Sequence, residues 1–141
     1  VRFGRPKDEN LVARKVGEIP FGIYAGPNYL ASTDPENYEW ISVEVGGVHG
    51  QKQQKLKERL SHKEPIMVTN NPELQWRAAC GEIGLAVLPD FLGALSNLIR
   101  LQDDYPMSAE IWLVTHEDLR HSPAIRVVMD FLISCFEAFK V

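Results

Sequence analysis

The sequence has no long hydrophobic run and little cysteine. No stretch approaches the roughly 18 apolar residues that cross a membrane as a helix, and no signal peptide is present. The two cysteines, Cys80 and Cys135, stand far apart and form no CxxC pair. Both fall among apolar residues of expected helices, so we expect buried free thiols in a reducing compartment. A redox-sensing pair is the alternative, and it would need exposed thiols.

The motifs that carry catalysis are also missing. No GxSxG or SxxK pattern occurs, and the glycine-rich stretch at residues 46–52 lacks the spacing of a phosphate-binding loop. His116 and His121 are five positions apart, with Pro123 close behind, so one helical face cannot supply two metal ligands. We expect an exposed, hydrogen-bonded loop there, and we expect no enzyme, cofactor or metal site. An enzyme would have to rely on scattered residues such as His116 or Cys80.

Composition indicates one ordinary globular domain. The chain has 141 residues, of which 45% are hydrophobic and 24% charged. Its formal net charge of −4 argues against nucleic-acid binding by this segment alone, because neutralising phosphates needs a basic face. The lysine-rich stretch 51–60 carries only Leu56 and Leu60 as apolar residues and predicts a solvated helix with a narrow contact stripe.

The stretch 66–89 predicts a strand, a helix and a second strand. Residues 66–68 are an apolar run that breaks at Thr69 and Asn70. Asn71 is a preferred N-cap, and Pro72 suits the first helical position. The run 85–88, stopped by a proline, is the second strand. A strand that ends at a helix N-terminus presents free N–H groups where ligands dock in open α/β sheets.

The flanking segments extend this α/β pattern. The sequence predicts strands at 1–3, 11–16, 19–25, 40–45, 98–101 and 110–115, short helices at 28–32 and 90–95, and a flexible link at 46–50. Ser122 and Pro123 open a last helix whose apolar positions are Ile125, Val128, Met129, Leu132, Cys135, Phe136 and Phe139. That wide apolar face needs a sheet to cover, so we expect partner strands to precede residue 1 and the chain to be a fragment.

The order of these pieces resembles the effector-binding domain of LysR-type transcriptional regulators. The resemblance is carried by residues 1–4 and 11–30, by Ala-Ala-Cys-Gly-Glu-Ile-Gly-Leu-Ala-Val-Leu-Pro-Asp-Phe at 78–91, and by the closing stretch 111–132. Each motif alone is weak, but together they span nearly the whole chain in the correct order.

The resemblance implies a type 2 periplasmic-binding-protein-like α/β fold, with one complete lobe and part of the other. On this mapping residues 18–108 form the second lobe, and residues 1–17 and 109–141 form the crossover strands and the remainder of the first lobe. Family members bind a small effector between the lobes and carry an N-terminal winged helix-turn-helix that contacts DNA. The resemblance further implies a cytoplasmic homodimer or homotetramer without membrane contact. A solute-binding protein of a transport system on the same fold is the alternative function.

Carried over by position, the implied ligand contacts are Arg2, Phe3, Gly4, Glu44, Gly46, Gly47, Thr69, Asn70 and Asn71. Arg2 can offer two parallel hydrogen bonds to a carboxylate effector, or it can be an exposed or lobe-bridging residue. The junction of Thr69, Asn70 and Asn71 can combine helix capping with ligand contact.

Overall fold

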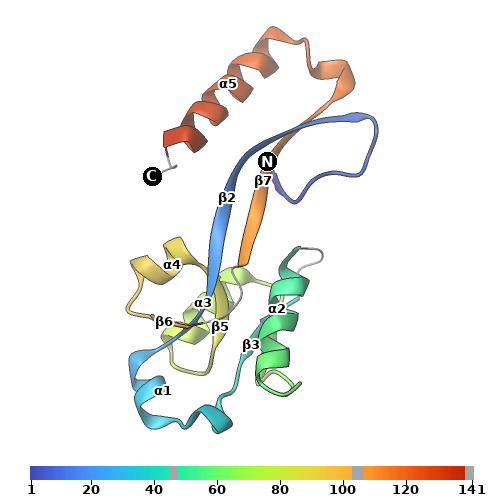
Figure 1. Cartoon of the computed structure of the whole chain (residues 1–141). Coiled ribbons are helices and arrows are strands. Elements are labelled where there is room, and N and C mark those ends of the chain that lie inside the picture. The colour runs from blue at the N-terminus through green and yellow to red at the C-terminus, as the bar shows by residue number, and fades with distance from the viewer. Residues whose placement is uncertain (45–47, 103–106, 139–141) are drawn as a thin grey trace. The chain divides into compact units, whose positions relative to one another are not determined.

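The chain folds into two compact units. The computed structural model describes residues 1–44, 48–102 and 107–138. Unit 1 consists of Val1–Ile19 and Ser108–Val141, and unit 2 of Pro20–Met107. Both boundaries fall within or at the end of a strand, so the chain passes between the units along β2 (Leu11–Ala25) and β7 (Met107–His116) (Figure 1).

Unit 1 is a small sheet with a helix packed on it. Strand β1 (Arg2–Phe3) pairs antiparallel with β7, and β7 lies beside β2. A short 3-10 turn, η2 (Glu117–Leu119), leads to α5 (Pro123–Ala138). The core of this unit joins strand residues to the inner face of α5: Val16, Ile111 and Leu113 pack against Ile19, Met129, Leu132, Ile133 and Phe136.

Strand β2 is longer than the sequence predicts. The separate segments expected at 11–16 and 19–25 form one strand of 15 residues. Its first part is mostly half-buried or exposed, whereas the last five residues, Phe21–Ala25, are all buried. Gly17 and Glu18 interrupt the apolar pattern, but the strand continues through them because an extended backbone needs no apolar side chains to pair.

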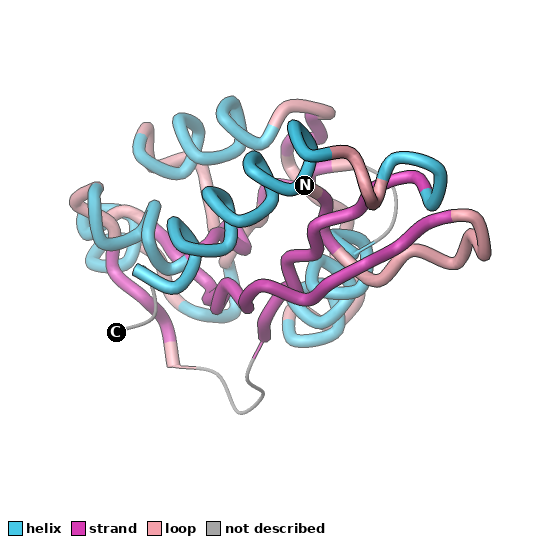
Figure 2. The backbone as a smooth tube through the Cα atoms, turned by 90° about the horizontal axis from the view of Figure 1, so that it is seen from above, coloured by secondary structure: helices cyan, strands magenta, loops and turns pink. Residues whose placement is uncertain are grey.

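Unit 2 alternates strands and helices (Figure 2). Its elements after β2 are α1 (Pro27–Ser32), η1 (Pro35–Asn37), β3 (Ile41–Val43), α2 (Val48–Arg59), β4 (Met67–Thr69), α3 (Pro72–Cys80), β5 (Ala86–Pro89), α4 (Asp90–Leu95) and β6 (Ile99–Leu101). Strand β3 pairs parallel with β4, and a parallel bridge joins Trp40 to Leu85. The buried end of β2 pairs antiparallel with β5 and with β6. The predicted strand–helix–strand unit is thus confirmed as β4, α3 and β5.

Helix α3 covers the main core of unit 2. Its Ala78 and Ala79 are buried with Ile41 of β3 and Leu88 of β5. Small alanines let the helix approach the sheet closely, and Trp76 and Met67 close the edges of this cluster. The helix positions the polar end of β4, because its first turn follows that strand after only two residues.

Helix α2 differs from the sequence-based prediction. It begins at Val48, so the flexible link expected at 46–50 is wrong from that residue onward, and residues 46 and 47 lie outside the described part of the chain. Lys52 and Gln53 are buried beside Leu56, so the helix is not merely solvated. The ammonium of Lys52 lies 4.9 Å from the centre of the Phe21 ring, and burial, followed by the nearby charge of Lys55, lowers the pKa of Lys52.

The cysteines and α5 bring two further corrections. Cys80 is exposed and Cys135 is half-buried, so the expectation of two buried thiols is wrong. Cys80 is the last residue of α3 and follows the buried Ala79, so it lies on the face of the helix that does not pack on the sheet. On α5, the face that contains Met129 and Leu132 packs on the strands. Val128, which was expected on the same face, is instead 55% exposed. Phe139, the last residue of the predicted apolar face, lies outside the described residues.

Candidate functional site

The polar junction between β4 and α3 is a capped helix N-terminus. The Thr69 hydroxyl oxygen accepts a hydrogen bond from the Asn71 backbone N–H at 3.1 Å. The Asn71 side-chain oxygen in turn accepts from the Glu73 N–H at 2.9 Å, so Asn71 is the N-cap of α3 as predicted. Two of the three junction side chains are therefore engaged in holding the local backbone.

Some hydrogen-bonding capacity remains at this junction. Pro72 has no N–H, and the Gln75 N–H donates to the Asn71 carbonyl. Within the described chain, the Leu74 N–H and the Asn70 side-chain amide have no hydrogen-bond partner, and both residues are exposed. The carboxylate of Glu73 is paired with Arg77 at 3.0 Å, which offsets the negative charge in the first turn. The junction can thus donate hydrogen bonds to a small anion.

Arg2, Phe3 and Gly4 lie in unit 1. Arg2 pairs opposite Trp112 and Phe3 opposite Ile111 in the β1–β7 register. Gly4 has a φ of 77°, which favours glycine, and its N–H donates to the Glu110 carbonyl at 3.0 Å. The exposed guanidinium of Arg2 makes no hydrogen bond or ion pair with any residue in the described ranges. Arg2 is therefore held on a strand with its side chain exposed.

Glu44 follows β3 directly, and its side chain is exposed. Its backbone N–H donates to the Thr69 carbonyl at 2.8 Å, which ties the ends of β3 and β4 together. Gly46 and Gly47, the other predicted contacts of this turn, lie outside the described residues. Of the predicted site residues, the structure thus places Glu44 at the same end of the β3–β4 pair as Thr69.

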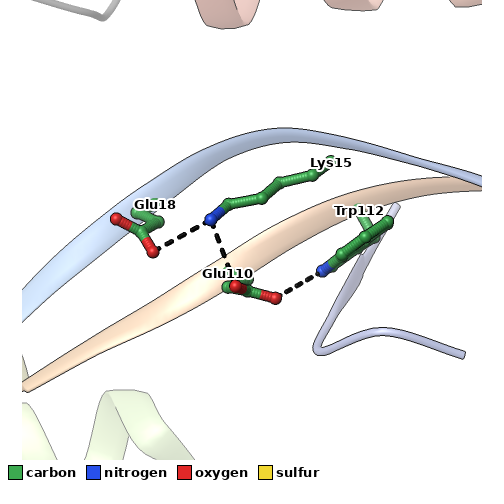
Figure 3. A network of polar contacts seen from close by, with 4 residues as sticks. All are labelled: Lys15, Glu18, Glu110 and Trp112. Carbon is green, nitrogen blue, oxygen red and sulfur yellow. Dashed lines mark hydrogen bonds and ion pairs between the residues drawn. The ribbon is translucent and has the colours of Figure 1, made fainter.

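A second polar group, in unit 1, involves residues that the sequence did not single out as a site. The Lys15 ammonium bonds Glu18 at 3.0 Å and Glu110 at 3.1 Å, and the indole N–H of Trp112 donates to Glu110 at 2.9 Å (Figure 3). The Trp112 bond and then the Lys15 bond lower the pKa of Glu110, while the two glutamates raise the pKa of Lys15. Because these charges satisfy one another at an exposed surface, the group serves to tie β2 to β7.

The histidines near the end of β7 have local roles. His116 Nδ1 accepts from the Asp118 N–H at 3.2 Å and caps η2, and Arg120 donates to His121 at 3.1 Å. This confirms the exposed, hydrogen-bonded loop expected there. Over the residues with described positions, no group of three potential metal ligands comes together, and no helix has the length and apolar character to cross a bilayer.

A hollow of about 450 Å³ between α2 and the β3–β4 pair was not predicted from the sequence. Its wall includes Ser42, Glu44 and Gln53, of which only Glu44 was predicted as a ligand contact. The usable signal was the alternation of Trp40, Ser42 and Glu44 along one strand, because residues two apart share a face. The other wall is formed by α2, and the sequence did not predict where that helix begins.

Comparisons with known proteins identify the fold and the family. The family model described as "LysR substrate binding domain" matches residues 1–136. The regulatory domain of an AphB variant from Vibrio vulnificus is similar, with a TM-score of 0.71 and 16% identity over 96% of this chain and 73% of that one. The CrgA regulatory domain, from a LysR-type transcriptional regulator of Neisseria meningitidis, has a TM-score of 0.70 and 20% identity over 94% of this chain and 72% of that one.

Full-length HypT from Salmonella typhimurium, a hypochlorite-specific LysR-type transcriptional regulator, has a TM-score of 0.74 and 14% identity. The alignment covers 96% of this chain and 50% of HypT, so the chain spans about half the length of that regulator. A search of curated protein sequences finds no match. These structures confirm the predicted periplasmic-binding-protein-like α/β fold. Because the family match runs through nearly all of the sequence, the chain belongs to the LysR substrate-binding domain family.

Proposed function

We propose that this chain is the ligand-sensing portion of a LysR-type transcriptional regulator, and that it binds a small-molecule effector. The observation that carries the proposal is the family match over residues 1–136. On this proposal the protein works in the cytoplasm, has no enzymatic activity and assembles as a homodimer or homotetramer. A winged helix-turn-helix elsewhere in the polypeptide makes the DNA contacts. The family match favours this function over solute binding for transport.

The effector binds, on this proposal, at the junction of Thr69, Asn70 and Asn71. The Leu74 N–H and the Asn70 amide offer hydrogen bonds, and the N-terminus of α3 carries partial positive charge. These features favour a ligand with a carboxylate. Arg2 would supply a charged donor for such a group, with Phe3 and Gly4 beside it, and Glu44, Gly46 and Gly47 complete the proposed set of contacts.

Binding regulates only if the effector prefers one arrangement of the protein over another. A ligand with equal affinity for two arrangements shifts neither population, however tightly it binds. The proposed effector must therefore bind the DNA-competent and the DNA-incompetent arrangements with different affinities. The readout of the sensor is a change in DNA contacts.

A thermal-shift screen of small carboxylates and aromatic acids against the full-length protein tests the proposal. A true effector at 100 times its Kd stabilises the protein by about 2.7 kcal/mol and should change the DNase footprint at the regulator's own promoter. Asn70→Ala should weaken the response, whereas Asn37→Ala, which removes an exposed amide from η1, should not. A flat response across the library together with an unchanged footprint would refute it.

A further inference from the structure

A second candidate site lies entirely within unit 2, between α2 and the β3–β4 pair. We call it the α2–β3 hollow and define it by Trp40, Ser42 and Glu44 on one side and Gly50, Gln53 and Lys57 on the other. Its volume is about 450 Å³, which is within the usual size range of small-molecule sites. It does not include Thr69, Asn70 or Asn71.

The sequence spacing explains how the hollow forms. Trp40, Ser42 and Glu44 alternate along β3 and its ends, so they share the face opposite to buried Ile41. Gly50, Gln53 and Lys57 recur at helical spacing and form one stripe of α2. Both stripes contain a small residue: Ser42 fills little space, and a Cβ placed on Gly50 would meet nothing within 4 Å.

The floor of the hollow holds buried polar groups with unused hydrogen-bonding capacity. Ser42 is only 8% exposed, and its hydroxyl makes no hydrogen bond to any residue that the structure describes. Gln53 is 5% exposed; its side-chain oxygen accepts from the Val43 N–H at 3.4 Å, which leaves its NH₂ group available. Because buried polar groups in native proteins are normally paired, this hydroxyl and this amide are groups that a bound ligand can satisfy.

Charges at the two ends of the hollow differ. At one end the Lys57 ammonium is paired with the Glu64 carboxylate at 3.2 Å, so these charges satisfy each other. At the other end the Glu44 carboxylate has no ion-pair partner in the described ranges. The indole N–H of Trp40 is already bonded to the Lys63 carbonyl at 2.7 Å, so the ring contributes an apolar surface. The unmatched charge of the hollow is therefore negative.

We propose that the α2–β3 hollow binds a small hydrophilic amine, separately from the effector junction. Its ammonium group pairs with Glu44, where the missing side chain of Gly50 leaves room. Its hydroxyl or amide groups bond to Ser42 and Gln53 over the ring of Trp40. Such a ligand satisfies each open group of the hollow, and its positive charge matches the carboxylate of Glu44.

The test is isothermal titration calorimetry on the full-length protein with matched pairs of probes. Glucosamine, ethanolamine and glycinamide carry the ammonium group, while glucose, ethylene glycol and acetamide lack it. We expect at least one amine to bind at least tenfold more tightly than its uncharged partner. Equal affinity within every pair, or no heat of binding from any of the three amines, would overturn the proposal.

Variants locate the binding. Glu44→Gln keeps the shape and removes the charge, so it should weaken amine binding at least tenfold, and Ser42→Ala should weaken it several-fold. Glu58→Gln, an equivalent change on the exposed part of α2, is the control and should bind normally. Asn70→Ala should also leave amine binding intact, which separates this site from the effector junction. Amine binding that survives both Glu44→Gln and Ser42→Ala would place it elsewhere and refute the proposal.

Discussion

The indole N–H of Trp112 donates a hydrogen bond to the carboxylate of Glu110 at 2.9 Å, two positions earlier in β7 (Figure 3). The pleat of the strand places both side chains on one face. The other carboxylate oxygen accepts from Lys15 at 3.1 Å, and the Arg5 guanidinium lies 5.7 Å from the centre of the Trp112 ring. These residues link β7 to two segments near the start of the chain, the one that holds Arg5 and strand β2.

This arrangement predicts an acid-dependent loss of stability. Because the Trp112 and Lys15 bonds lower the pKa of folded Glu110 below its ordinary value of 4.5, their contribution is present above pH 4.5 and is lost as pH falls through the folded pKa. Glu110→Gln should therefore lower the melting temperature at pH 7. The difference in melting temperature between this variant and the unmodified protein should shrink as the pH falls below 4.5. Melting curves at several pH values measure this effect.

Glu9→Gln provides the control for that experiment, because Glu9 is exposed in the loop before β2 and takes part in no hydrogen bond or ion pair with the described residues. Its melting temperature should match that of the unmodified protein at every pH. A constant difference between Glu110→Gln and the unmodified protein from pH 7 to pH 3 would contradict the role assigned to the ionised carboxylate.

The capping role of Asn71 gives a second prediction. Asn71→Ala removes the acceptor for the Glu73 N–H and should lower the free energy of unfolding by about 1 kcal/mol, measured by urea titration. Asn70→Ala, one position earlier, removes an amide that has no such bond and should leave stability within about 0.5 kcal/mol. Equal losses in the two variants would mean that the cap does not stabilise α3.

Elements with local signals were predictable from the sequence. Asn71 and Pro72 mark the start of α3, and Ser122 and Pro123 mark the start of α5, because capping and proline geometry act within one turn. The start of α2 was not predictable. Gly50 lies in its first turn, and glycine disfavours helices, so burial of Lys52, Gln53 and Leu56 must outweigh local propensity.

The two candidate sites also differ in whether the sequence alone could predict them. The junction at Thr69 to Asn71 follows from a strand that ends next to a helix, which is visible in a single stretch of sequence. The α2–β3 hollow needs Ser42 and Gln53 to face each other, and that juxtaposition depends on how a helix lies against a sheet. Exposure of Cys80 likewise depends on which face of α3 packs on the sheet, since its neighbour Ala79 is buried there.

The third prediction concerns the core of unit 1. Leu113 on β7 is 1% exposed and packs in the cluster under α5, so Leu113→Ala should leave a cavity and cost about 2–5 kcal/mol of unfolding free energy. Val127 on α5 is 68% exposed, and Val127→Ala should change stability by no more than about 0.5 kcal/mol. Urea titrations of both variants compare the two faces, and a comparable loss in each would mean that the outer face of α5 is covered in solution.

The last prediction compares two glycines that a sequence does not distinguish. At Gly84 an added Cβ would lie 2.8 Å from the carbonyl oxygen of Glu39, and a backbone oxygen cannot rotate away. The same carbonyl accepts from the Leu85 N–H at 2.9 Å, and the Leu85 carbonyl accepts from Ile41, so the clash falls on the link between β3 and β5. Gly84→Ala should therefore cost about 1–3 kcal/mol by urea titration.

Gly17 lies within β2, and a Cβ there would meet nothing within 4 Å. Since glycine in a strand pays an entropic cost, Gly17→Ala should be neutral or stabilise the protein by about 0.5–1 kcal/mol. The two substitutions add the same methyl group, so their difference reports only the surroundings of each backbone position. If Gly84→Ala were as stable as Gly17→Ala, the close approach of residue 84 to the Glu39 carbonyl would not exist in solution. The strands at the parallel bridge between Trp40 and Leu85 would then lie farther apart than hydrogen bonds of 2.8 and 2.9 Å allow.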